Sequence, residues 1–206
     1  MLSAMTDTAG PAPGLRADAR RNQERILDAA RAVITEQGPE FGVNDVALRA
    51  GVGLRTVYRR FAGREDLISA VFEQYVTDEV QPIVEAATAH PDPWRALANG
   101  LEATVVTVAA NSALLTAARD TALVTRATAE GFVKPLSRAL QRAQAAGAAR
   151  PDLDSSDLPS LIAMVVATML AVPDLETAQP ARWRRYLALL LEGCRASEVG
   201  GALPLL

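Results

Sequence analysis

The feature that most constrains this chain is a pair of short helical patterns joined by a glycine turn, over residues 43–61. Val46, Ala47 and Ala50 give the first pattern an apolar stripe, and Gly51 follows where a left-handed residue ends a helix. At about 100° per residue, the second pattern separates an apolar side from an arginine-rich side. The segment therefore predicts a helix-turn-helix.

The second helix of this motif has two faces of different chemistry. Its apolar face consists of Leu54, Val57, Tyr58 and Phe61, and its opposite face of Arg55, Thr56, Arg59 and Arg60. Arginine suits bidentate contact with guanine and also pairs with phosphate, while hydroxyl groups suit phosphate oxygens. An ordinary solvated helix face is the alternative interpretation. For Tyr58, a ring packed in the core is as compatible with the pattern as a phosphate contact.

Two further residues complete the candidate DNA contacts. Asn44 is placed to cap the first helix, with Asp45 at the positive end of the helix dipole. Arg64 begins the helix that follows the motif and is predicted to anchor the DNA backbone. The candidate DNA-binding residues are Asn44, Arg55, Thr56, Tyr58, Arg59, Arg60 and Arg64.

Residues 21–75 resemble the N-terminal domain of the TetR (tetracycline-repressor) family of bacterial transcription regulators. The resemblance is carried by Ile26-Leu27-Asp28-Ala29-Ala30, Gly38, Val46-Ala47, Ala50-Gly51-Val52, Thr56-Val57-Tyr58, Phe61 and Arg64-Glu65-Asp66-Leu67. The chain departs from the family at Arg60, where His is common, and at Arg64, where Lys is common. Both replacements keep a donor and a positive charge, so phosphate anchoring is expected to persist while base preference could differ.

The charge distribution agrees with a specific DNA-binding segment. The chain has a net charge of −3, which argues against indiscriminate coating of nucleic acid. Between Arg16 and Arg64, however, ten arginines face six acidic residues, a net charge of +4. The single Cys194 excludes an internal disulfide and agrees with a cytoplasmic protein, and its apolar surroundings predict a buried thiol.

Several other sites and compartments are not expected. No apolar run reaches the roughly 18 residues that a membrane helix needs, and the opening stretch lacks a signal-peptide pattern. His90 is the only histidine and lies in a predicted loop, so neither a metal site nor a cofactor is expected. No nucleophile, phosphate-loop or paired-ligand motif supports an enzyme.

The predicted fold is all-α with about nine helices. We expect a disordered tail over residues 1–15, a three-helix DNA-binding domain over 16–63, and a larger effector-binding and dimerisation domain over 64–206. Arg16, Arg20 and Arg21 follow the tail, around the start of a first helix expected from about Ala19 to Gln37. They are either an arm that reaches the minor groove or a tail with solvated charges.

The second half of the chain has helical periodicity throughout. A long fourth helix from Arg64 is expected to be interrupted or kinked at Pro82. Asp92 is predicted to cap the next helix and Pro93 to be its first residue. Ser155 or Ser156 is predicted to cap the helix near residues 155–172. The helices after Pro82 are predicted near residues 93–110, 112–124, 127–147, 155–172 and 180–196.

The last two predicted helices are apolar on more than one side. Their apolar residues are Leu158, Leu161, Ile162, Met164, Val165, Val166, Met169 and Leu170, then Trp183, Tyr186, Leu187, Leu190, Leu191 and Cys194. Such helices need cover on both sides, which predicts a homodimer joined by a four-helix bundle. The resemblance implies the same arrangement. A two-fold axis would separate the recognition helices by roughly 34–36 Å and favour a nearly palindromic operator.

The resemblance also implies an effector site in the larger domain. The candidate pocket residues are Phe72, Tyr75, Trp94, Leu101, Thr104, Val108, Phe132 and Met164. Small apolar residues interleaved with Thr suit a mostly apolar pocket with a few orienting hydrogen bonds. They equally suit an ordinary core in which each Thr bonds back to its own helix.

Taken together, these patterns predict a cytoplasmic dimeric repressor that binds an operator in double-stranded DNA and is released by a small, mostly apolar effector. One alternative is a constitutive dimeric DNA-binding protein without an effector. Another is a helical enzyme or carrier that retains the helix-turn-helix as a structural module.

Overall fold

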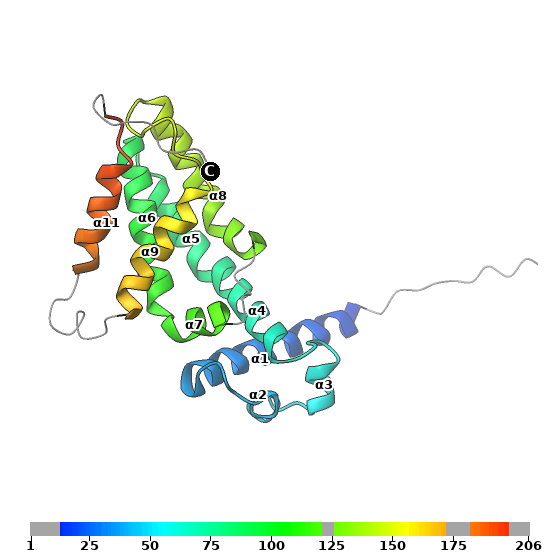
Figure 1. Ribbon diagram of the computed structural model, residues 1–206. Coiled ribbons are helices and arrows are strands. Elements are labelled where there is room, and N and C mark those ends of the chain that lie inside the picture. Colours follow the sequence, from blue (N-terminus) through cyan, green and yellow to red (C-terminus); the bar gives the residue numbers. More distant parts are fainter. Residues whose placement is uncertain (1–12, 121–125, 172–181, 198–206) are drawn as a thin grey trace, which may run out of the picture. The chain divides into compact units, whose positions relative to one another are not determined.

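The computed structural model describes residues 13–120, 126–171 and 182–197, and every regular element in these ranges is a helix (Figure 1). The chain divides into two compact units between Val71 and Phe72. The predicted all-α fold is confirmed. None of the described helices combines the length and apolarity that crossing a membrane requires.

The N-terminal unit consists of α1 (Pro13–Gln37), α2 (Val43–Ala50), α3 (Leu54–Tyr58) and the beginning of α4 (Arg64–Tyr75). Its core contains an apolar stripe of α1, Ile26, Leu27, Ala30, Val33 and Ile34. Helix α1 packs against α2, and α2 against α3.

Helix α1 begins earlier than the sequence predicted. Arg16, Arg20 and Arg21 belong to its first turns, so the expected arm before the helix is part of the helix. Two exposed pairs on this helix, Arg20 with Glu24 at 3.5 Å and Arg21 with Asp18, lie at helical spacing. Such pairs stabilise a helix locally, which explains why it continues beyond the residues that reach the core.

The predicted interruption at Pro82 is a change of helix type. The π-helical turn η1 (Val76–Val80) follows α4 and leads directly into α5 (Gln81–Thr88), with Pro82 in the first turn of α5. Proline has no N–H and its ring crowds the carbonyl four residues earlier. A locally wider turn before it accommodates both effects and lets the helix continue.

The C-terminal unit is built around α6 (Pro93–Ala110), which packs against α5, α8 (Arg126–Ala145) and α9 (Asp157–Ala171). Helix α7 (Ser112–Asp120) follows α6, and α11 (Arg182–Gly193) lies beside α9 (Figure 1). Within the described residues, the observed bounds agree with the predicted helices to within a few residues. The predicted helical residues 121–124, 172 and 180–181 lie outside the described ranges.

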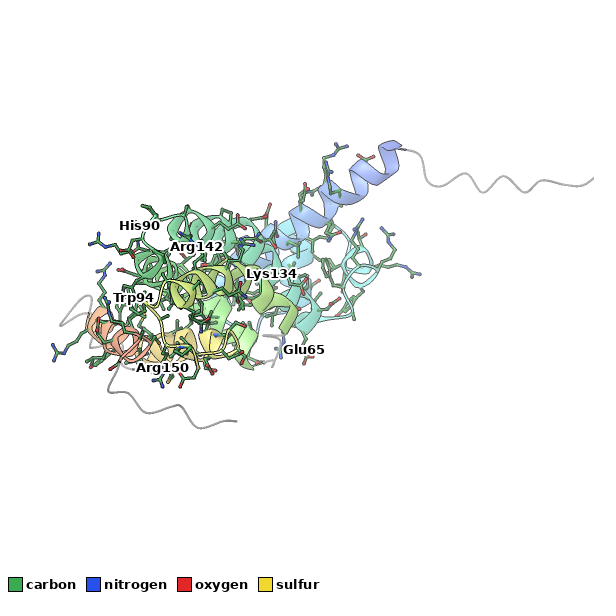
Figure 2. The ribbon with its side chains drawn as sticks, turned by 90° about the horizontal axis from the view of Figure 1, so that it is seen from above. Glu65, His90, Trp94, Lys134, Arg142 and Arg150 are labelled. Atoms are coloured by element: carbon green, nitrogen blue, oxygen red, sulfur yellow. The ribbon has the colours of Figure 1, made fainter. Side chains whose placement is uncertain are left out.

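The packing of α5, α6 and α8 is tightest at Gly100. A Cβ atom there would lie 2.6 Å from Cγ2 of Thr88 and 2.8 Å from Cδ2 of Leu136. Near this contact, Arg142 of α8 donates to the carbonyls of Thr88 at 3.3 Å and His90 at 3.1 Å (Figure 2). One guanidinium therefore joins α8 to the end of α5 and to the loop that follows.

The predicted helix caps were right for α6 and wrong for α9. Asp92 accepts the N–H of Arg95 at 2.9 Å and Pro93 begins α6, as expected. Before α9, the carboxylate of Asp154 accepts the N–H of Ser156 at 2.8 Å, and Asp157 accepts the N–H of Asp154 at 2.9 Å. This reciprocal pair replaces the predicted serine cap, because a carboxylate is a stronger acceptor than a hydroxyl.

Cys194 is buried, as predicted from its apolar surroundings. Burial is the main reason that the pKa of its thiol lies above the ordinary value. The chain around it pairs with the loop after α8: Arg150 donates its N–H to the Cys194 carbonyl at 3.0 Å, and Ala196 donates to Ala148 at 3.1 Å.

Candidate nucleic-acid interface

The turn between α2 and α3 is closed by two backbone hydrogen bonds. Gly51 has φ of +65°, and its N–H donates to the Leu48 carbonyl at 3.1 Å, while the N–H of Val52 donates to Ala47 at 3.0 Å. This bonding pattern is the Schellman motif that the glycine predicted. It fixes the direction in which the chain enters α3.

A side chain from α1 reinforces the same turn. The Arg25 guanidinium donates to the Ala50 carbonyl and to the Asn22 side chain, the latter at 3.4 Å. A cation at this position satisfies the C-terminal end of α2 and interacts favourably with its dipole. Arg25 was absent from the sequence-based candidates, because nothing local to it signals a contact with a residue 25 positions later.

Asn44 does not cap α2. Helix α2 begins at Val43 and Gly42 holds the cap position in an extended conformation, without a side-chain hydrogen bond. A Cβ at Gly42 would lie 3.0 Å from Oδ2 of Asp45, so the first turn closes tightly over Gly42. Asn44 therefore lies inside the first turn, exposed to solvent, and its side chain is available for an external contact.

The apolar face of α3 is narrower than predicted. Val57 and Phe61 are buried, but Leu54 is 38% and Tyr58 is 52% exposed. The reason is the length of the helix: α3 ends at Tyr58, and the chain leaves it through a turn in which Phe61 donates to the Val57 carbonyl at 2.9 Å. A single turn buries one side chain and leaves its neighbours at the surface.

On the exposed surface of α3 and the turn after it, Arg55 and Arg59 are the arginines that are available for new contacts. Both side chains are exposed, and no ion pair or side-chain hydrogen bond involves either guanidinium within the described residues. Thr56 lies between them, partly exposed, and the Tyr58 ring is next to them. These residues present two free cations and two hydroxyl groups, the chemistry that contacts phosphates and base edges.

Three other arginines of the same unit are held by neighbouring side chains. Arg60 donates to Oε1 of Gln23 at 2.8 Å, whereas Arg64 pairs with Glu40 at 2.8 Å. Arg49 similarly donates to the Glu36 carboxylate. This hydrogen bond is the main reason that the pKa of Glu36 lies below its ordinary value.

The sequence did not predict the residues that bind these three arginines. Gln23, Glu36 and Glu40 lie between 13 and 37 positions from the arginines that they contact. Only the packing of α1 against the helix-turn-helix brings them together. The candidate interface therefore divides into free arginines on α3 and restrained arginines at its border.

In the C-terminal unit, most of the candidate pocket residues are part of the core. The buried ones are Phe72, Tyr75, Leu101, Thr104 and Val108. The hydroxyl of Thr104 donates to the Gly100 carbonyl at 2.8 Å, and that of Tyr75 to the Thr107 carbonyl. Both polar groups are thus already engaged.

The remaining candidates lie elsewhere. Trp94 is only partly buried, with the Arg195 guanidinium 4.4 Å from the centre of its ring. Met164, expected in the interior, is 50% exposed and lines a surface groove of about 310 Å³ between α9 and α11. The Phe132 side chain lies outside the described residues. A ligand pocket formed by this set remains a prediction.

Comparison with protein families identifies both parts of the chain. Residues 26–71 match the model of bacterial regulatory proteins of the tetR family, and residues 92–196 match the C-terminal domain of SbtR-like transcriptional regulators. An HTH-type transcriptional regulator of Staphylococcus aureus is 34% identical over 61 residues, which are 29% of this chain. The matched residues are 33% of the length of this curated relative.

Solved structures resemble the chain over most of its length. A TetR transcriptional regulator of Streptomyces coelicolor is 28% identical with a TM-score of 0.56, covering 85% of this chain and 99% of its own. One from Mycobacterium vanbaalenii is 27% identical with a TM-score of 0.54, over 88% and 99%. FadR of Bacillus subtilis, solved with stearoyl-CoA, shares the fold at 23% identity, with a TM-score of 0.67 over 83% and 98%. The chain therefore belongs to the TetR family of DNA-binding transcriptional regulators, with an SbtR-like C-terminal domain.

Proposed function

We propose that this regulator is a cytoplasmic repressor that binds a nearly palindromic operator as a homodimer and leaves it when a small, mostly apolar effector binds. The observation that carries the DNA-binding part is the exposed α3 surface, where Arg55 and Arg59 have no partner among the described residues. Arginines in this state are not committed to the protein and can be satisfied by a DNA groove.

The proposed contacts fall into two roles. Arg55, Thr56, Tyr58 and Arg59 are the base-reading or groove-lining set on α3, and Asn44, Arg60 and Arg64 are backbone anchors around it. The exposed Asn44 and the positive border residues suit phosphate oxygens, which fix orientation without reading sequence.

The effector would act by selecting between two conformations. A ligand that binds better to the conformation unsuited to the operator draws population away from the DNA-bound form. A coupling of about 1–3 kcal/mol would weaken operator binding about 5- to 150-fold.

A second candidate function is a constitutive DNA-binding dimer without an effector. It is favoured by the engaged hydroxyls of Thr104 and Tyr75, and by the absence, within the described residues, of any buried side-chain N or O atom that lacks a hydrogen bond. A core with no unsatisfied polar group offers a ligand little to orient it.

Selection of bound duplexes from random DNA, at fixed salt, tests the proposal. We expect a dyad-symmetric consensus, and a set of bound sequences without symmetry would contradict operator binding by a dimer. Titration of the selected duplex with candidate effectors then separates the two functions. A tight ligand that lowers DNA affinity supports the repressor, and tight ligands without any coupling support the constitutive dimer.

Two single variants test the division of roles. Arg55→Ala is expected to relax base preference, because it removes a reader of base edges. Arg64→Ala should lower affinity about equally for all sequences, since it removes a phosphate contact. Equal weakening across sequences by both variants would contradict the division.

A further inference from the structure

Arg60 is held by a neutral side chain, unlike Arg49 and Arg64, the two other arginines held at the border of the α3 surface. Its Nη1 donates to Oε1 of Gln23 on α1 at 2.8 Å, in an exposed hydrogen bond, and Arg60 itself is partly buried. A carboxamide carries no net charge, so the guanidinium keeps its full positive charge. One of its five N–H donors is used, and the others remain for a second acceptor.

The acidic partners of the neighbouring arginines have a different effect. Glu40 lies 2.8 Å from Arg64, and Glu36 lies 2.5 Å from Arg49. In each of these exposed pairs a carboxylate offsets the positive potential that would attract DNA. A phosphate that binds Arg64 must compete with Glu40, whereas no carboxylate among the described residues is paired with Arg60.

We propose that Gln23 is a positioning residue for the DNA interface, which holds Arg60 in one conformation before a backbone phosphate arrives. This inference rests on the proposed operator binding. A flexible arginine loses conformational entropy when it is immobilised on DNA, and prior restraint by Gln23 reduces that loss. Arg60 then contributes more to affinity than Arg64, whose charge Glu40 offsets.

The first test separates restraint from charge at Gln23, using the full-length protein and the duplex selected from random DNA. Gln23→Ala removes the restraint and should weaken binding about three- to tenfold per subunit, the cost of ordering one long side chain, without changing the salt dependence. Gln23→Glu keeps an acceptor but adds a competing anion. It should weaken binding and reduce the slope of log affinity against log salt by about 0.9 per subunit, the contribution of one phosphate contact.

A double-mutant cycle tests whether Gln23 acts through Arg60. Arg60→Ala should weaken binding by itself, and adding Gln23→Ala to it should cause no further loss. Thermal melts of each variant identify a general folding defect. If Gln23→Ala weakens binding equally with and without Arg60, its effect does not pass through that arginine and the inference is wrong.

The reciprocal change at the other border arginine provides a gain-of-affinity test. Glu40→Gln converts the acidic partner of Arg64 into an amide, so affinity should rise a fewfold and the salt slope should increase. Glu73→Gln, an exposed substitution in the other unit, makes the same change of net charge and should leave both unchanged. No gain from Glu40→Gln would contradict the competition between carboxylate and phosphate.

The outcomes separate this inference from the function on which it rests. If the unmodified protein binds no symmetric duplex, the proposed operator binding fails. If it binds one, Arg60→Ala weakens that binding and Gln23→Ala does not, then Arg60 is a contact without a positioning residue. In that case the inference fails while the function stands.

Discussion

In the helix-turn-helix, some side chains pack into the core and hold α3 in place, and others face solvent. Val57 is fully buried and Phe61 nearly so, while Arg55 and Arg59 beside them are exposed. The position of the arginines in a DNA groove therefore depends on how firmly one valine and one phenylalanine are packed. A loss of packing at Val57 would move the arginines without altering their chemistry.

We expect Val57→Ala to lower the free energy of unfolding of the N-terminal unit by about 2 kcal/mol, because it removes buried carbon and leaves a cavity. Leu54→Ala is the matched control on the same helix. Leu54 is 38% exposed, so its truncation should cost less than about 1 kcal/mol. Urea denaturation followed by circular dichroism measures both variants. Equal destabilisation would show that Leu54 packs as firmly as Val57.

The residues of α3 also show where sequence reasoning reached its limit. The helical period correctly separated Arg55, Thr56 and Arg59 from Val57. The position of Gly51 correctly predicted a left-handed residue at the end of α2. The period placed Leu54 and Tyr58 on the apolar face, with Tyr58 left open between a packed ring and a phosphate contact, because it was applied as if the helix continued to Phe61. The observed helix ends at Tyr58. The hydrogen bond from Arg60 to Gln23 was beyond any local pattern, because it depends on how α1 packs.

At the level of elements, the C-terminal unit depends on close approach of α5, α6 and α8. The sequence placed α6 and α8 correctly and expected an interruption at Pro82 before α5, because apolar periodicity and proline positions are local signals. Their mutual distance was not predictable. Gly100 is one glycine among 13 in the chain, and only the structure shows that Thr88 and Leu136 fill the space beside it.

Gly100→Ala is expected to destabilise the protein by about 1–3 kcal/mol, because the added methyl group would overlap Thr88 and Leu136 and push the helices apart. Gly193→Ala is the control, since nothing lies within 4 Å of a Cβ at that helical position. Alanine favours helix over glycine, so the control should leave stability unchanged or raise it by up to about 1 kcal/mol. Similar melting temperatures for the two variants would contradict the tight contact.

The cap of α6 makes this unit sensitive to acid. The hydrogen bond from the Arg95 backbone is the main reason that the pKa of Asp92 lies below its ordinary value of 3.8. Because the folded-state pKa is lowered, the carboxylate contributes stability above pH 3.8 that is lost as the pH falls through the folded-state pKa. Asp92→Asn preserves the cap without titrating. The melting temperature of the Asp92→Asn variant should therefore fall less than that of the unmodified protein between pH 5 and pH 3. An identical fall would show that protonation of Asp92 does not cause the loss of stability in acid.

At the scale of the whole molecule, positive charge is concentrated in the segment that contains the helix-turn-helix. The segment from Arg16 to Arg64 carries a net charge of +4 within a chain of net charge −3. The remainder is acidic and is repelled by DNA, so contact with a duplex is directed to the N-terminal unit. The net charge alone argues only against indiscriminate coating of nucleic acid, and the distribution of charge along the chain indicates which segment a duplex would contact.

The outer face of α9 and α11 is where we expect two copies to meet. Met164 and Leu189 are 50% and 62% exposed there, beside the groove between these helices. If this face joins a dimer, Leu189→Glu would bury an unpaired charge, and sedimentation should show a shift from dimer to monomer. Ile83→Glu, on α5 and 46% exposed, is the matched control and should sediment like the unmodified protein.

The same pair of variants links assembly to DNA binding. A dimer holds its second recognition helix close to the second half-site, so it gains affinity from both. The Leu189→Glu variant should therefore bind the symmetric duplex at least about tenfold more weakly than the unmodified protein. Its weak affinity for an isolated half-site should not change. If Leu189→Glu remained dimeric, or became monomeric yet bound the full duplex as tightly as before, two-fold recognition through α9 and α11 would be wrong.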